Sequence, residues 1–129
     1  YAKFMADINK KILIVEDDKD YLFILQTNFR NEGFSIIAAK DGREGLDLAE
    51  KEKFDLIILD ILMPNMDGIE MAKQLKQKGI NIPIMFLTNV SDIEQISKAE
   101  EAVPSDYIIK SDMTVDRIIV QVKKKLGIE

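Results

Sequence analysis

Residues 11–18 read Lys-Ile-Leu-Ile-Val-Glu-Asp-Asp, an apolar run that passes directly into three acids. Ile12, Ile14 and Val15 are β-branched, and no polar residue interrupts the run. This pattern is typical of a parallel strand that is buried on both faces. The stretch therefore predicts a buried strand with acidic side chains at its carboxyl end.

Similar apolar runs recur along the chain and alternate with longer amphipathic stretches. The four further runs are Ser35–Ala39, Asp55–Leu59, Ile82–Leu87 and Tyr107–Ile109. Five stretches lie between and after these runs, and the fourth of these stretches spans residues 91–103. In each stretch, apolar residues recur every three or four positions, as in helices with one buried face. These residues are Leu22, Leu25 and Phe29; Leu46 and Ala49; Ile69, Ala72 and Leu75; Ile93, Ile96 and Ala99; and Val115, Ile118, Ile119, Val122 and Leu126.

The regular alternation of strands and helices predicts an α/β fold, in which helices cover both faces of a parallel sheet. Right-handed crossovers leave few topologies for five βα units. We expect a doubly wound, five-stranded (βα)5 sheet in the order 2-1-3-4-5. Ligands of such sheets bind at the carboxyl ends of the strands.

Composition limits the classes of function that the chain can have. Its 129 residues favour one domain, and we expect residues 10–129 to form it, with residues 1–9 a tag remnant or a disordered lead-in. The net charge of −5 argues against direct, non-specific nucleic-acid binding. No apolar run approaches the roughly 18 residues of a membrane span, and the profile is typical of a cytoplasmic protein. Because cysteine and histidine are absent, the chemistry must come from carboxylates, hydroxyls and lysines.

Polar residues follow the predicted strands at the edge where ligands are expected. Glu16 and Asp17 follow the first strand, Asp60 follows the third, Thr88 ends the fourth and Lys110 ends the fifth. Carboxylates that converge there repel each other by about 4 kcal/mol per pair at roughly 4 Å and an effective dielectric constant of about 20. A hard cation such as Mg²⁺ relieves this repulsion. Carboxylates, a hydroxyl, a lysine and a metal ion together indicate a site for a phosphoryl group.

Each residue taken alone also has an ordinary structural interpretation. Asp18 is expected to be the N-cap of the first helix. Asp60 could begin a turn, and Thr88 and Lys110 could be loop residues. It is the combination of these residues at the strand ends that favours a phosphoryl site.

Four motifs in order resemble the receiver domain family of two-component response regulators, from Lys11 to Leu126. They are the stretch 11–18, the stretch Asp55-Leu-Ile-Ile-Leu-Asp-Ile-Leu-Met-Pro-Asn-Met-Asp-Gly68, the apolar run that ends in Thr88, and Asp106-Tyr-Ile-Ile-Lys110. The resemblance implies a flavodoxin-like domain that acts as a bacterial phosphorylation switch rather than as an enzyme with a separate substrate. A histidine kinase or a phosphotransfer protein would be the phosphodonor.

The resemblance also assigns roles to individual residues around the acceptor. It implies that Asp60 accepts the phosphoryl group. It further implies that Mg²⁺ is bound by Asp60, by Asp17, by Glu16 through a water molecule, and by the backbone carbonyl of Leu62. Oxygen ligands of this kind are typical for Mg²⁺ in proteins.

Three further residues complete the implied switch. Thr88 would bond a phosphoryl oxygen, Lys110 would pair with the phosphoryl charge, and Tyr107 would turn inward after phosphorylation. The surface formed by the fourth helix, the fifth strand and the fifth helix would then change its affinity for an effector or for a second copy of the chain.

Two departures from the family pattern support an alternative. Asn89 follows Thr88, where a small residue is usual, and Ser111 follows Lys110, where proline is usual. A domain that keeps the fold but binds partners without phosphorylation is therefore the second hypothesis. A phosphohydrolase is disfavoured, because the position two residues beyond the acceptor is Leu62 rather than an acid.

Overall fold

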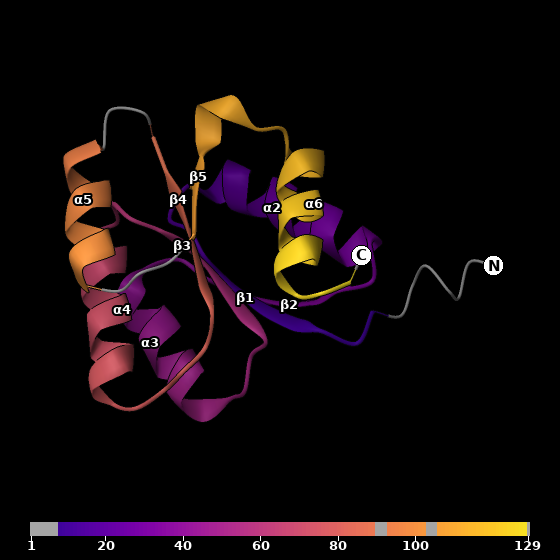
Figure 1. Ribbon diagram of the computed structural model, residues 1–129. Helices are drawn as coiled ribbons and strands as arrows, with labels where there is room; N and C mark the ends of the chain where they lie inside the picture. Colours follow the sequence, from indigo (N-terminus) through magenta and orange to yellow (C-terminus); the bar gives the residue numbers. More distant parts are fainter. Residues whose placement is uncertain (1–7, 90–92, 103–105, 129) are drawn as a thin grey trace.

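The computed structural model describes residues 8–89, 93–102 and 106–128 (Figure 1). Their strands form one parallel sheet in the order β2-β1-β3-β4-β5, as predicted. The strands are β1 Lys11–Val15, β2 Ser35–Ala39, β3 Leu56–Asp60, β4 Ile84–Thr88 and β5 Asp106–Ile109.

Helices cover both faces of the sheet, which also confirms the prediction (Figure 1). One face carries α2 (Lys19–Asn31) and α6 (Val115–Lys125). The other carries α3 (Gly42–Lys51), α4 (Gly68–Gln77) and α5 (Ile93–Ala102). Among the described residues, no helix combines the length and the apolar character that crossing a bilayer requires.

β2 has the predicted bounds, and the other strands differ from the predicted runs by one or two residues at one or both ends. β3 includes Asp60, because its backbone still pairs with Leu87 of β4. Pro83 precedes β4, since proline has no N–H to donate to a neighbouring strand. Lys110 does not end β5 but begins a short 3₁₀ helix, η2 (Lys110–Asp112). The expected limits of the fourth helix, residues 91 and 103, lie outside the described residues.

The core is divided by the sheet into two apolar layers. Ile12 and Ile14 belong to the layer of α2 and α6 with Phe29, whereas Leu13 and Val15 belong to the layer of α3 and α4. These four β1 residues are fully buried. A shift of one residue would exchange the two faces of a strand, so the two layers fix which side chains each strand directs to each face.

Candidate functional site

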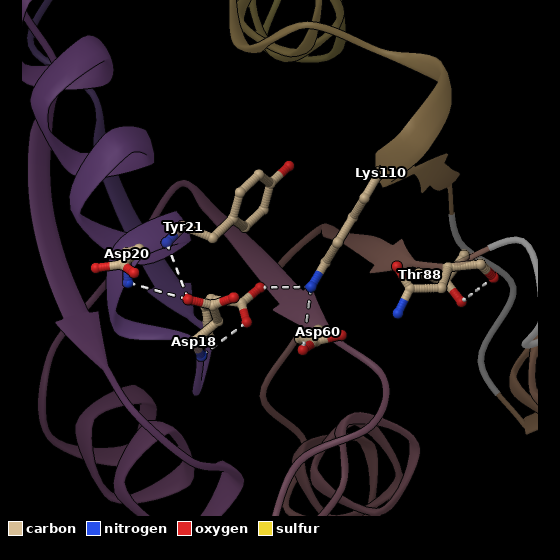
Figure 2. Close-up of polar contacts among 8 residues, drawn as sticks. Asp18, Asp20, Tyr21, Asp60, Thr88 and Lys110 are labelled. Atoms are coloured by element: carbon tan, nitrogen blue, oxygen red, sulfur yellow. Dashed lines mark hydrogen bonds and ion pairs between the residues drawn. The ribbon is translucent and has the colours of Figure 1, made fainter.

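The alternation of side chains along the strands brings three charged residues to one face. Glu16, Asp60 and Lys110 each follow, by two positions, a strand residue buried in the layer of α2 and α6. These strand residues are, in the same order, Ile14, Ile58 and Ile108. The three charged side chains therefore lie at the carboxyl edge of the sheet on the side of α2 and α6. Figure 2 shows Asp60 and Lys110 of this group.

Lys110 joins the two buried carboxylates of this site. Its Nζ lies 2.9 Å from Glu16 Oε1 and 3.3 Å from Asp60 Oδ2. The side chain of Glu16 is fully buried, and those of Asp60 and Lys110 are 9% and 17% exposed. The other Glu16 oxygen accepts a hydrogen bond from the backbone N–H of Asp18 at 3.0 Å.

The protonation of the site follows from burial and from these contacts. Burial, together with the nearby charge of Glu16, raises the pKa of Asp60 to about 7, although Lys110 opposes the shift. Burial disfavours the charged form of Lys110, but the hydrogen bond to Glu16 and the charge of Asp60 outweigh it and raise the pKa of Lys110. At neutral pH, Lys110 is therefore a cation and Asp60 is partly protonated.

The acidic residues of the site fit a divalent cation. Glu16, Asp17 and Asp60 each offer a carboxylate oxygen, and the three oxygens lie within 4.8 Å of one another. Because Lys110 offsets only one of three negative charges, a net charge of about −2 remains when all three acids are ionised. A hard divalent ion with oxygen ligands balances that charge.

The two acids that follow Glu16 are placed differently from each other. Asp17 is exposed and belongs to the acidic group. Asp18 is the N-cap of α2, as expected, because its side chain accepts hydrogen bonds from the N–H groups of Asp20 and Tyr21 at 3.0 and 3.2 Å. This cap orients the first turn of α2 beside the site.

The two expected switch residues face the other layer of the core. Thr88 is fully buried, lies one strand away from Asp60 and donates a hydrogen bond to the carbonyl of Asn89 at 3.3 Å (Figure 2). Tyr107 stacks on Phe86, with ring centroids 5.4 Å apart and planes at 14°. The Tyr107 ring therefore already lies against the layer of α3 and α4.

The loop between β3 and α4 carries Leu62, whose side chain is 46% exposed. A side-chain hydrogen bond and a close approach of two backbone segments restrict this loop. Asn65, at φ +68°, donates a hydrogen bond from Nδ2 to Asp41 Oδ2 at 3.0 Å. Gly68 lies so close to the Asp60 carbonyl that an added Cβ would be 2.2 Å from that oxygen. The contact between Asp41 and this loop was not predicted, because no local sequence pattern links the two segments.

Replacing Asp41 should loosen this loop and the start of α3. The Asp41 side chain also accepts a hydrogen bond from Glu44 N at 2.9 Å as the N-cap of α3. We expect Asp41→Ala to lower the free energy of unfolding by about 1 kcal/mol, the usual value of an N-cap, and somewhat more through the lost contact with Asn65. Asp41→Ser keeps a capping oxygen and should cost less. Urea denaturation measures both, and an unchanged midpoint in Asp41→Ala would contradict the expectation.

Comparison with known proteins agrees with this fold and site. The family described as "Response regulator receiver domain" matches residues 12–123. The chain is 34% identical over 122 residues to sporulation initiation phosphotransferase F of Bacillus subtilis, covering 95% of this chain and 98% of that protein. It is 48% identical over 81 residues to the alkaline phosphatase synthesis transcriptional regulatory protein PhoP of Bacillus subtilis, covering 63% of this chain and 34% of that protein. The chain thus spans about a third of the length of PhoP.

A solved structure of a response regulator is also similar to this chain. The response regulator protein TrrA of Thermotoga maritima, in complex with Mg²⁺ and BeF, is 31% identical, with a TM-score of 0.77 and coverage of 89% of this chain and 97% of that one. The chain belongs to the receiver domain family of two-component response regulators.

Proposed function

We propose that Asp60 is the phosphoacceptor of this receiver domain and that a histidine kinase or a phosphotransfer protein is its phosphodonor. The observation that carries the proposal is the pairing of Lys110 Nζ with both Asp60 and Glu16 in a largely buried site. A carboxylate nucleophile beside a fixed cation suits phosphoryl transfer, because negative charge is spread over the transferring group.

The proposed site would hold Mg²⁺ through Asp17, Asp60 and the Leu62 carbonyl, with Glu16 bound through water. When bound, this ion would supply positive charge to the phosphoryl oxygens and favour the ionised form of Asp60. The spacing of the three acidic side chains supports this assignment, and the Mg²⁺ in the TrrA complex supports it by similarity.

In the proposed transfer, an ionised Asp60 oxygen attacks the phosphorus of the donor's phosphohistidine. The new O–P bond forms as the N–P bond breaks, and the imidazole leaves with the electron pair of that bond. Lys110, 3.3 Å from Asp60, neutralises charge on the transferring group. The chain thus takes part only in its own phosphorylation and is not an enzyme that turns over a separate substrate.

The proposed output is a change in the surface formed by α5, β5 and α6. Thr88 would bond a phosphoryl oxygen, and Tyr107, stacked on Phe86, would respond to that movement. The surface would then bind an effector or a second copy of the chain. The proposed location is the cytoplasm, where a kinase of this class would act as donor.

Phosphorylation with a small donor tests the proposal. Wild-type protein incubated with acetyl phosphate and Mg²⁺ should gain the mass of one phosphoryl group. Asp60→Asn should gain none, and chelation of Mg²⁺ should prevent the gain. Asp55→Asn is the matched control, because Asp55 is exposed just before the opposite end of the same strand and should leave the gain unchanged.

Two results would contradict the proposal. Wild-type protein that gains no mass at high donor concentration would favour a domain that binds partners without phosphorylation. A mass gain that persists in Asp60→Asn would place the acceptor at another residue.

A further inference from the structure

Tyr21, in the first turn of α2, lies beside the amine of Lys110 (Figure 2). Lys110 Nζ is 5.0 Å from the centre of the Tyr21 ring. At this distance the negative face of an aromatic ring attracts a cation. Tyr21 is half-buried and packs against the apolar layer of α2 and α6, so the ring is held in place by the core.

The ring, rather than the hydroxyl, is the part of Tyr21 that this contact uses. The Tyr21 hydroxyl oxygen is buried and has no hydrogen-bond partner among the described residues. A hydroxyl in that position contributes no hydrogen bond of its own to the site. Replacement by phenylalanine would therefore keep the feature that faces Lys110.

The contact with the Tyr21 ring matters because the backbone of Lys110 lies just after β5, away from the two carboxylates. β4 separates β5 from β3, and β3 separates β4 from β1, so the lysine must cross the sheet edge to reach Asp60 and Glu16. Neighbouring strands lie about 4.8 Å apart, and a lysine side chain reaches across more than one such spacing only when it is extended. A lysine side chain on its own has many rotamers, and most of them would direct Nζ elsewhere.

We propose that Tyr21 is a positioning residue for phosphoryl transfer, whose ring face keeps Lys110 extended with Nζ between Glu16 and Asp60. The inference rests on the proposed function, in which Lys110 neutralises the transferring phosphoryl group. Tyr21 does not touch the reacting atoms. It acts through Lys110, and its contribution disappears when that lysine is absent.

Substitutions at Tyr21 and Lys110 separate the role of the ring from that of the hydroxyl and from general packing. Tyr21→Leu removes the ring face but leaves an apolar side chain, and Tyr21→Phe keeps the ring. We expect Tyr21→Leu to slow phosphorylation by acetyl phosphate and Mg²⁺ by about 3- to 30-fold, the range of a cation–π contact. Tyr21→Phe should keep a rate close to that of wild type. In a Lys110→Met background, adding Tyr21→Leu should produce no further decrease.

A second readout reports the contact without any phosphorylation. Protons of the Lys110 ε-methylene group are expected beside the ring face, so their NMR signal should be shifted upfield in wild type and in Tyr21→Phe. In Tyr21→Leu the signal should return to the position of an ordinary lysine. Lys110→Met identifies the signal by its loss, and thermal melting of each variant verifies that it is folded.

The outcomes distinguish this inference from the proposed function. If wild-type protein is not phosphorylated, the proposed function is overturned. If, in that case, Tyr21→Leu also leaves the NMR signal of the Lys110 ε-methylene protons unchanged, the inference is overturned too. If wild type is phosphorylated, an equal rate in Tyr21→Leu overturns the inference alone. The inference is also overturned if Tyr21→Phe and Tyr21→Leu slow phosphorylation equally. It is overturned as well if Tyr21→Leu slows phosphorylation in the Lys110→Met background as much as it does in wild type.

Discussion

Lys110→Met should lower the free energy of unfolding of the metal-free protein by about 3 kcal/mol, because it leaves two buried carboxylates without their cation. Lys110 Nζ lies 2.9 Å from Glu16 and 3.3 Å from Asp60, and the Glu16 side chain is fully buried. Methionine fills a similar volume but cannot carry charge. The destabilisation thus measures the electrostatic role of the lysine rather than its packing.

Mg²⁺ should reverse part of this loss. A site with one positive charge fewer binds a divalent cation more favourably, and a ligand that binds only the folded state stabilises it. Urea denaturation of wild type and Lys110→Met, each with a chelator and with excess Mg²⁺, measures both effects. Adding Asp60→Asn to Lys110→Met should also recover stability, since it removes one of the uncompensated charges.

Lys125→Met is the matched control for this prediction. Lys125 is also ion-paired, with Asp106 at 2.8 Å, but the two side chains are 37% and 51% exposed. Exposed pairs contribute about 0–1 kcal/mol, so this variant should be nearly neutral and insensitive to Mg²⁺. A loss in Lys110→Met no larger than that in Lys125→Met would show that the site does not need the lysine's charge.

The sequence predicted much of the fold because its signals are local. Apolar runs such as Ile12–Val15 identified the strands, and Asp18 was expected to be the N-cap of the first helix, as it is. The strand order followed from the rule on crossovers rather than from any residue. The convergence of charged side chains at the carboxyl edge could then be inferred from the strand ends alone.

The contacts that the sequence did not predict depend on tertiary placement. From the sequence alone, Tyr21 is indistinguishable from an ordinary helix residue. Its position beside Lys110 follows from the way in which α2 packs on the sheet. The hydrogen bond between Asn65 and Asp41 joins two distant segments for the same reason. The placement of Lys110 in a 3₁₀ turn rather than at the end of β5 was also not predicted, because this turn has no distinct sequence signal.

Asp60→Asn should increase the free energy of unfolding relative to wild type as pH rises, because of the raised pKa of Asp60. In the metal-free folded protein, burial and the charge of Glu16 raise the pKa of Asp60 to about 7, from an ordinary value of 3.8. Between these values the folded state retains a proton that the unfolded state has lost. The contribution of Asp60 to stability therefore falls as pH rises from about 4 and levels off above about 7.

The size of this effect is large for a single residue. Each pKa unit corresponds to about 1.4 kcal/mol, so the shift corresponds to a loss of up to about 4 kcal/mol between low and high pH. Asparagine does not ionise. Relative to wild type, Asp60→Asn should thus gain stability steadily across this pH range, with the largest gain at about pH 8.

Urea denaturation of both proteins in the presence of a chelator, at a series of pH values, measures the difference between them. Comparing the two proteins cancels groups that titrate equally in both, including Asp41, whose pKa is lowered mainly by its hydrogen bond from the Glu44 backbone. Excess Mg²⁺ should reduce the advantage of Asp60→Asn at high pH, because a bound cation favours the ionised carboxylate. A difference that stays constant with pH would mean that Asp60 has an ordinary pKa, and the charge balance inferred for the site would then be wrong.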